Sequence, residues 1–329
     1  MFKTFDHRRK AFLQAVLALT LACMSGLSMA NTFPSKALRI VVPFGPGGVG
    51  DLTARLVAGK LSESLGQPVV VENKPGAGGV VATETVVRSE PDGHTMFLMS
   101  NGSAITAALF KKLPFDMGKD LTPVSTLGYF DLAILTNADS PYKTLADVVN
   151  FAKANPDKLN IGSIAIGSTQ NLTAELFKSA AGIKAQVVPF NNTPALIGAM
   201  RGNQIDLSVE ILGPALTHIK SGAFRPLSVT GDKRSVVLPD VPTAVEQGLS
   251  GLVSSSWNAL AVPSKTPPEV VARLNKELVA ILATPEVKQK LLALNIDARS
   301  STVGFAADLL ANDTKRWAGV IERAGIPTK

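Results

Sequence analysis

Cysteine is almost absent from this sequence. Among 329 residues the only cysteine is Cys23, which lies within the first thirty. A lone thiol cannot close an intramolecular disulfide, and removal of that segment would also exclude a cysteine nucleophile and a thiolate metal site. Of the three histidines, the two beyond the first thirty residues, His94 and His218, lie far apart in unrelated contexts. We therefore expect neither to be a metal ligand or a catalytic base.

Motifs of the common enzyme classes are also missing. The sequence has no G-x-S-x-G elbow, no H-E-x-x-H zinc motif, no D-x-D calcium loop and no lysine after a glycine-rich phosphate loop. Basic residues exceed acidic ones, 33 to 26, for a net charge of +7. They do not form the stripe of basic residues interleaved with aromatics that nucleic-acid binding would require. We expect a protein that is not an enzyme, uses no cofactor and binds no nucleic acid.

The first thirty residues have the three parts of a secretory signal peptide. Basic residues open the chain, the apolar run AFLQAVLALTLACM follows, and small residues at Ser28 and Ala30 fit cleavage after Ala30. An uncleaved anchor is the alternative, because the run approaches the ~18 residues that span a bilayer. Arg8 and Arg9 resemble a twin-arginine signal, so export by the twin-arginine route is a second alternative. Cleavage removes four basic residues and one acid, so the remaining 29 and 25 give a net charge of +4, which weakly favours an anionic ligand.

Beyond residue 30, segments typical of strands alternate with segments typical of helices. β-branched runs such as LRIVV, PVVVE, TMFLMS, NIGSI, IDLSVEI and WNALAV alternate with helical periodicity at 52–65, 144–154, 171–181, 194–202, 214–222 and 268–283. This alternation predicts an α/β fold of βαβ units, with parallel sheets covered by helices on both faces. Thr193 and Pro194 are expected to cap and begin one helix, and Pro268 and Glu269 to begin another.

A glycine-rich loop, VVPFGPGGVGD at 41–51, joins the first strand-like run to the first helix-like run. Its glycines spell G-x-G-x-x-G, and Glu72 ends the next strand 22 residues after Gly50, which matches the dinucleotide-binding fingerprint. Such a loop exposes backbone N–H groups at the positive end of a helix, so it binds carboxylates as well as phosphates. Pro46 removes one donor and Asp51 is placed to cap the helix, and both disfavour a pyrophosphate.

The segment IGSIAIGSTQNLTAELF, residues 161–177, repeats the strand–loop–helix pattern of 38–65. Hydroxyl and amide side chains cluster at its strand-to-helix junction, and no charge precedes Glu175. Neutral donors at a helix N-terminus suit a carboxylate; ordinary helix capping is the alternative. Two similar α/β halves would bring the two loops together across a cleft, with the chain crossing near 130–137 and returning between 230 and 257.

Three further features are weaker candidates. The turn ENKPGAGG contains Gly78 and Gly79 before an expected helix, and SNGSAI contains Ser100 and Ser103 after a strand. Glu210 lies near the end of the alternating strand IDLSVEI. There it could face the cleft and bind a ligand amine or hydroxyl, and a solvated position at the sheet edge is the alternative.

Many segments match one family in order along the chain. They are FPSKALRIVVPFGPGGVGDLTARLVAGKLSESLGQPVVVENKPGAGG, PDGHTMFLMS, SPYKTLADVVNFAKANP, VPFNNTPALIGAMRGNQIDL, RSVVLPDVPTAVEQG and WNALAVPSKTPPEVVARLN. Through them the chain resembles the Bug family, the periplasmic solute receptors of tripartite tricarboxylate transporters, over essentially its whole length beyond residue 30. The resemblance implies a type II periplasmic-binding-protein fold, in which two α/β domains close around a ligand cleft.

The resemblance also implies the binding site, the partners and the location. Receptors of this family hold a small carboxylate between the loop after the first strand and its counterpart in the second domain. Carried over to this sequence, the loops supply Phe44, Gly47, Gly48, Asp51, Gly167, Ser168, Thr169 and Asn171. The expected partners are the carboxylate and membrane transporter subunits, and the receptor is expected to be monomeric and periplasmic. A ligand sensor for a signalling partner and a periplasmic nicotinamide-dependent oxidoreductase are the alternatives.

The family fold and the expected crossings together predict the domain organisation. The expected parts are a signal peptide at 1–30, a discontinuous first domain at 31–130 plus 241–329, and a second domain at 131–240. Four residues near the expected ligand depart from the family pattern and leave the ligand's identity open. Gly50 stands where threonine is usual, Asn171 where histidine is frequent, and Val209-Glu210 where Phe-Asp is frequent.

Overall fold

The computed structural model describes residues 33–329, so the expected signal peptide and its cleavage site after Ala30 lie outside the described residues. The predicted alternation is confirmed, because each strand-like run and each helix-like segment coincides with an element of the same type, apart from a few residues at the ends. Within residues 33–329, no helix combines the length and the apolar composition needed to cross a membrane.

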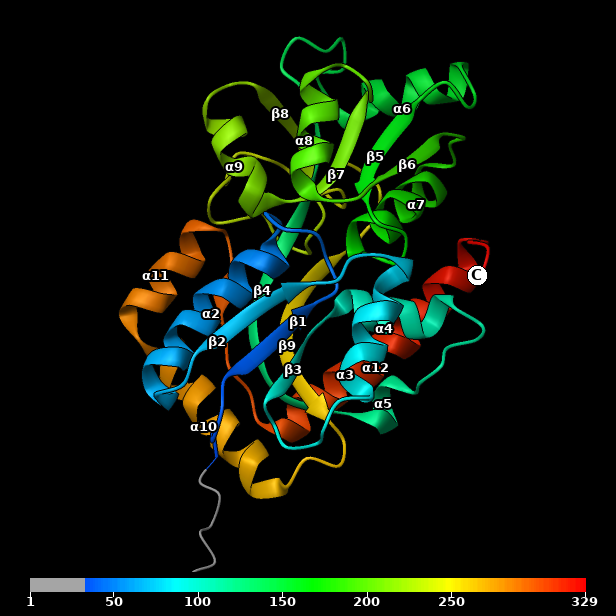
Figure 1. The fold of residues 1–329 in the computed structure, drawn as a ribbon. Coiled ribbons are helices and arrows are strands. Elements are labelled where there is room, and N and C mark those ends of the chain that lie inside the picture. The colour runs from blue at the N-terminus through cyan, green and yellow to red at the C-terminus, as the bar shows by residue number, and fades with distance from the viewer. Residues whose placement is uncertain (1–32) are drawn as a thin grey trace, which may run out of the picture. The chain divides into compact units, whose positions relative to one another are not determined.

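The first sheet is mixed, with strand order β2-β1-β3-β9-β4 (Figure 1). Its strands span Val69–Asn73, Leu38–Val42, Thr95–Ser100, Ser255–Pro263 and Leu121–Asn137, and the short β10 (Asp297–Ala298) pairs with β4. β1 runs parallel to β2 and β3, but β9 is antiparallel to both β3 and β4. The expectation of parallel sheets is wrong for β9, because the chain returns through 230–254 without the crossover helix that a parallel neighbour needs.

The second sheet shares β4 with the first. Its order is β4-β7-β5-β6, with β8 also paired to β4; β5, β6, β7 and β8 span Asn160–Ile164, Gln186–Phe190, Leu207–Ile211 and Phe224–Val229. β5 is parallel to β6 and β7, whereas β7 and β8 are antiparallel to β4. β4 pairs with β9 as far as Asp131 and with β7 and β8 from Leu132 onward. One long strand therefore connects the two sheets.

Helices cover both faces of the first sheet. α2 (Val49–Leu65) packs against α10 (Pro268–Ala283), and α4 (Asn101–Leu109) packs against α12 (Val303–Arg323). Figure 1 places these two pairs on opposite sides of β1, β3 and β9. The shorter helices of this half are η1 (Ala77–Gly79), α3 (Val80–Val87), α5 (Met117–Asp120) and α11 (Pro285–Ala293). The second sheet carries α6 (Leu145–Ala154), α7 (Thr169–Ala181), α8 (Thr193–Arg201) and α9 (Leu212–Lys220).

The expected start of α8 needs a correction. Asn192 is its N-cap, and the Asn192 side chain accepts the Ala195 N–H at 2.9 Å, so Thr193 is the first helical residue and not the cap. Asparagine and threonine both cap helices well, and sequence alone does not choose between neighbours. Pro268 and Glu269 occupy the first turn of α10, as predicted.

Candidate functional site

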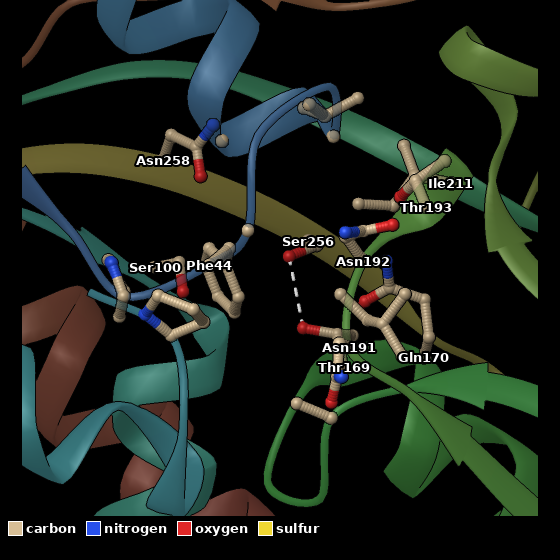
Figure 2. Close-up of a pocket in the computed structure, with 18 of the residues that line it drawn as sticks. Phe44, Ser100, Thr169, Gln170, Asn191, Asn192, Thr193, Ile211, Ser256 and Asn258 are labelled. Carbon is tan, nitrogen blue, oxygen red and sulfur yellow. Dashed lines mark hydrogen bonds between the residues drawn. The ribbon is translucent and has the colours of Figure 1, made fainter. Parts of the chain in front are cut away.

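A cavity lies between the two sheets, with a wall that draws on both. It encloses about 530 Å³ of space between atoms, part of it open to solvent. Its polar side chains belong to Ser100, Thr169, Gln170, Asn191, Asn192, Thr193, Ser256 and Asn258 (Figure 2). Among the described residues, no side chain that lines it carries a charge. An anion in this cavity would therefore be held by neutral donors.

Five helices begin at the wall of this cavity. Each of α2, α4, α7, α8 and α9 contributes its N-cap or its first residue, namely Val49, Ser100, Thr169, Thr193 and Ile211. Every helix N-terminus exposes unpaired N–H groups and about half a positive charge. α2 and α9 have no side-chain cap, so their first N–H groups have no capping side chain to bind. The helix dipoles therefore favour a negative charge at this wall, although no lining side chain among the described residues is cationic.

Asp51 holds the first loop from behind the cavity. Its Oδ2 accepts the Gly47 N–H at 3.0 Å, and its Oδ1 accepts from Arg55 Nε at 3.0 Å and from Asn73 Nδ2 at 2.9 Å. Asn73 Nδ2 also donates to the carbonyl oxygen of Phe44 at 2.9 Å, and Phe44 lines the cavity. Asp51 is buried in the first turn of α2 and is not the N-cap that we expected, because the helix already begins at residue 49.

The hydrogen bonds of Asp51 change its pKa. Burial alone would raise the pKa of this carboxyl, but the bonds from Arg55, the Gly47 N–H and Asn73, with the Arg55 charge, outweigh burial and lower it. A carboxyl with a lowered folded-state pKa stabilises the native state above its unfolded pKa, near ~3.9, and loses this contribution as the pH falls through the folded-state pKa.

We therefore expect Asp51→Asn to lower the free energy of unfolding above about pH 5, and the difference from wild type to shrink below about pH 4. The reason is that protonation removes the same charge from the wild-type carboxyl. Urea unfolding between about pH 3 and pH 7 measures this. Asp308→Asn, at an exposed position on α12, controls for the loss of one negative charge. A difference that stays constant over the whole range would contradict the expectation.

The second loop reaches the main cavity through Thr169. Ser168 is the N-cap of α7 and accepts the Asn171 N–H at 3.1 Å, while the Asn171 side chain donates to Ser163 Oγ at 3.1 Å. Asn171 does not line the main cavity. Thr169 Oγ1 lies 3.1 Å from Ser256 Oγ on β9, as Figure 2 shows, and so connects α7 with the first sheet.

A smaller cavity of about 310 Å³ shares part of its wall with the first. Its lining residues include Gly78, Gly79, Ser103, Gly167 and Ser168, while Phe44 and Ser100 line both cavities. The second loop closely approaches the turn that contains Gly78 and Gly79, since a Cβ built on Gly167 would lie 3.2 Å from Gly78 Cα. Gly48 and Thr169 line the main cavity alone. The predicted site residues that line neither cavity are Gly47, Asp51, Asn171 and Glu210.

Glu210 lies directly behind the wall of the main cavity. It is 1% exposed, so the alternative of a solvated edge position is wrong. Its Oε1 accepts from Gln170 Nε2 at 2.8 Å and from the Ile211 N–H at 2.6 Å, and both of these residues line the cavity. Burial raises the pKa of Glu210, although the bonds from Gln170, the Ile211 N–H and the nearby Thr193 hydroxyl oppose it. Oε2 has no partner with hydrogen-bond geometry among residues 33–329.

Two parts of the wall were not among the predicted site residues. One is the turn between β6 and α8, which contributes Asn191, Asn192 and Thr193; the other is Ser256 and Asn258 on β9. Signals for both exist in the sequence. FNNTP is another strand-to-helix turn, and β9 contains two buried polar residues, Ser256 and Asn258, beside its apolar residues. Buried polar side chains need partners, so they often mark a site.

The structure does not support the dinucleotide fingerprint. Glu72, which would bind the ribose, lies 3.5 Å from Arg39 Nη1 and 3.2 Å from Lys74 Nζ, and it does not line the main cavity. The glycine loop and this carboxylate therefore do not form one site. In the described part of the chain, no group of three or more metal-ligating side chains is placed to hold a metal ion.

Known proteins resemble this chain over nearly its whole described length. A family model described as the tripartite tricarboxylate transporter family receptor matches residues 53–326. Protein BugT of Bordetella pertussis is 32% identical over 302 residues, which cover 91% of this chain and 93% of BugT. Both matches agree with the family resemblance of the sequence.

Two solved structures share the fold across both sheets. MatC from Rhodopseudomonas palustris, solved with bound malate, is 31% identical with a TM-score of 0.84, covering 88% of this chain and 100% of MatC. The R. palustris protein Rpa4515, solved with adipate, is 29% identical with a TM-score of 0.86, covering 90% of this chain and 99% of that chain. Both ligands are dicarboxylic acids of low mass.

Proposed function

Because the chain belongs to the family of tripartite tricarboxylate transporter receptors, we propose that it captures a small carboxylate in the main cavity and delivers it to the membrane subunits of such a transporter. We place the mature receptor in the periplasm, as a monomer, after export and cleavage behind Ala30. We propose no catalytic step, because no side chain that lines the cavity titrates near neutral pH.

One observation carries this proposal: five helix N-termini converge on a cavity whose wall has no charged side chain. Backbone N–H groups at helix starts bind anions, and the helix dipoles favour a negative charge there. A charge-assisted hydrogen bond contributes about 1.5–3 kcal/mol, so a few of them reach the ~8 kcal/mol of micromolar affinity. The ligands of the two similar solved structures, malate and adipate, support a carboxylate of this size.

We further propose that residues 31–130 with 241–329 and residues 131–240 act as two domains that open and close around the ligand. Two hydroxyl pairs link the proposed domains beside the cavity, Thr169 with Ser256 at 3.1 Å and Thr173 with Ser254 at 2.7 Å. These bonds can form only when the domains are together. Closure of this hinge type would present a different surface to the transporter with and without ligand.

Thermal melting of the mature chain against a panel of small carboxylates tests the proposed function. Unfolding and refolding before the experiment removes ligand that co-purifies with the protein. At a ligand concentration of about 100 times Kd, we expect the melting temperature to rise by roughly 5 °C or more. The panel includes monocarboxylic, dicarboxylic and tricarboxylic acids, with reduced and oxidised nicotinamide cofactors as further members.

The outcomes separate the remaining alternatives. A shift with one class of carboxylates supports the receptor, whereas a shift with a nicotinamide cofactor alone would establish the oxidoreductase alternative and overturn the proposal. To distinguish transport from sensing, uptake of the acid that binds is compared in cells with and without the receptor. Loss of uptake without the receptor is the expected result, and unchanged uptake would favour the sensor.

A further inference from the structure

Two side-chain amides in the wall of the main cavity have their orientation fixed from behind. They belong to Gln170, at the start of α7, and Asn258, on β9, so they come from the two different halves of the site. Both residues are almost fully buried, at 3% and 1% exposure. In each amide the amino group is bonded to a residue behind the wall.

Glu210 fixes the amide of Gln170. Its Oε1 accepts both the Gln170 amino group at 2.8 Å and the Ile211 N–H at 2.6 Å. The Gln170 carbonyl oxygen accepts no hydrogen bond from the described residues. The buried carboxyl thus leaves an acceptor of Gln170 free, on a side chain that lines the cavity.

Thr53 fixes the amide of Asn258 in the same way. The Thr53 hydroxyl donates to the Val49 carbonyl oxygen at 2.7 Å, so its oxygen can only accept from Asn258, whose Nδ2 lies 3.2 Å away. Figure 2 shows the Asn258 amide nitrogen turned toward α2 and its oxygen turned away from that helix. The Asn258 carbonyl oxygen, like that of Gln170, has no donor among residues 33–329.

The cavity therefore presents two kinds of polar group. Asn192 uses its side-chain oxygen to cap α8, which leaves its amino group as a donor, and the helix starts add backbone N–H donors. Gln170 and Asn258 present acceptors. A carboxylate group satisfies the donors but brings only further acceptors, so it would leave both carbonyl oxygens unpaired in a closed cavity. An unpaired buried acceptor costs free energy that a donor on the ligand would recover.

We infer that the ligand is a carboxylate that also carries a hydrogen-bond donor, a hydroxyl or an ammonium group, and that Gln170 and Asn258 select it over the unsubstituted acid. The inference rests on the proposed function, since it concerns the same cavity. Glu210 acts here as a positioning residue, because it holds the Gln170 amide and does not itself line the cavity. Its raised pKa agrees with a buried carboxyl that has no cationic partner.

Calorimetric titration with matched acids tests this inference. The mature wild-type protein is titrated with acids that share a carbon skeleton and differ in one substituent, for example succinate, malate and aspartate, or propionate, lactate and alanine. For the skeleton that binds, we expect the hydroxy or amino acid to bind about tenfold more tightly than the unsubstituted acid. The malate and aspartate arms show whether the donor is a hydroxyl or an ammonium group.

Variants assign the preference to the two amides. Gln170→Met and Asn258→Leu keep much of the side-chain volume without the acceptor. Each should lower severalfold the ratio of the affinity for the hydroxy or amino acid to the affinity for the unsubstituted acid. The double variant should bring this ratio near one. Glu210→Gln keeps an acceptor for Gln170 and should retain the ratio, whereas Glu210→Met should lower it as Gln170→Met does. Gln247→Met is the matched control, because Gln247 donates to the Leu227 carbonyl oxygen and does not line the cavity.

Equal affinity for the substituted and unsubstituted acids in the wild type would overturn the inference, and that comparison needs no variant to fold. A ratio unchanged in both Gln170→Met and Asn258→Leu would overturn the assignment to these residues. If no acid of any kind binds, the proposed function fails, and this inference fails with it. Binding without discrimination leaves the proposed function intact and removes only the inference.

Discussion

Gly45→Ala should weaken carboxylate binding roughly 5- to 100-fold while the ligand-free protein melts at nearly the wild-type temperature. Gly45 lies in the first loop and lines the main cavity. A Cβ at this position would lie 2.7 Å from Asn192 Cβ and 3.0 Å from the Asn191 carbonyl oxygen, in the opposite half of the site. One of these atoms belongs to the backbone, so the loop before α8 would have to move away.

The expected separation of binding from stability follows from where the clash lies. In the open form that we propose, the two loops would be apart, and an alanine at residue 45 would contact nothing in the second sheet. The penalty therefore falls on the ligand-bound, closed form alone. Calorimetry with the acid that gives the largest melting shift measures the loss, and small-angle scattering with ligand shows whether closure is impaired.

Gly59→Ala is the matched control for this substitution. Gly59 lies on the exposed side of α2, and a Cβ there would meet no atom within 4 Å. Alanine has a higher helix propensity than glycine, so this variant should bind as the wild type does and melt at the same or a slightly higher temperature. If Gly45→Ala also binds like the wild type, the approach of the two loops is not part of the bound state.

Gly47 presents a different case within the same loop. Its φ of +85° favours glycine, and a Cβ would lie 3.0 Å from Pro194 Cγ. A substitution there strains the backbone whether the site is open or closed. Loss of binding in Gly47→Val would therefore come with a loss of stability, and Gly45→Ala is the more informative change.

Two loops of the site, at 41–51 and 161–177, could be predicted from the sequence because each is encoded locally. A β-branched run, a cluster of glycine, serine or asparagine, and a helical period identify a strand-to-helix turn wherever it occurs. In parallel strands these turns lie at the same edge of the sheet. The strand–loop–helix pattern occurs twice in the sequence, and its two loops follow β1 and β5. Both loops line the main cavity, as the expectation of two facing halves requires.

The remainder of the site depends on contacts between segments that are distant in the chain. β4 changes partners between Asp131 and Leu132, where its pairing passes from β9 to β7, two strands that lie far from it in the sequence. The orientation of Asn258 is set by Thr53, which lies 205 residues away. Gly50 makes the dinucleotide pattern, yet in the structure its absent side chain leaves room for Phe44, whose ring atom would lie 3.0 Å from a Cβ. No local pattern contains this information.

The C-terminal helix α12 also has a role that its own sequence does not show. Trp317 is fully buried, and its Nε1 donates to Asn101 Oδ1 at 2.6 Å. Asn101 begins α4 directly after Ser100, which lines both cavities, and its Nδ2 donates to the Ser255 carbonyl oxygen at 2.9 Å. One indole thus supports the two wall segments that start at residues 100 and 255.

Trp317→Ala should consequently lower the free energy of unfolding by about 3–5 kcal/mol, the usual cost of truncating a large buried aromatic side chain. Trp317→Phe keeps most of the buried ring but leaves Asn101 Oδ1 without its donor in a fully buried position, which adds about 1–3 kcal/mol to the cost of the smaller ring. Urea unfolding of the mature protein measures both losses.

Trp257→Phe separates the effect of the lost hydrogen bond from that of the smaller ring. Trp257 is also buried, and its Nε1 donates to Asp313 Oδ2 at 2.6 Å, but the Asp313 side chain is 14% exposed. Water can replace the indole at Asp313 and cannot reach Asn101, which is 0% exposed. Trp317→Phe should therefore destabilise the protein more than Trp257→Phe, by about 1 kcal/mol or more. Equal losses in the two variants would mean that Asn101 finds another donor, and the indole of Trp317 would then contribute through packing alone.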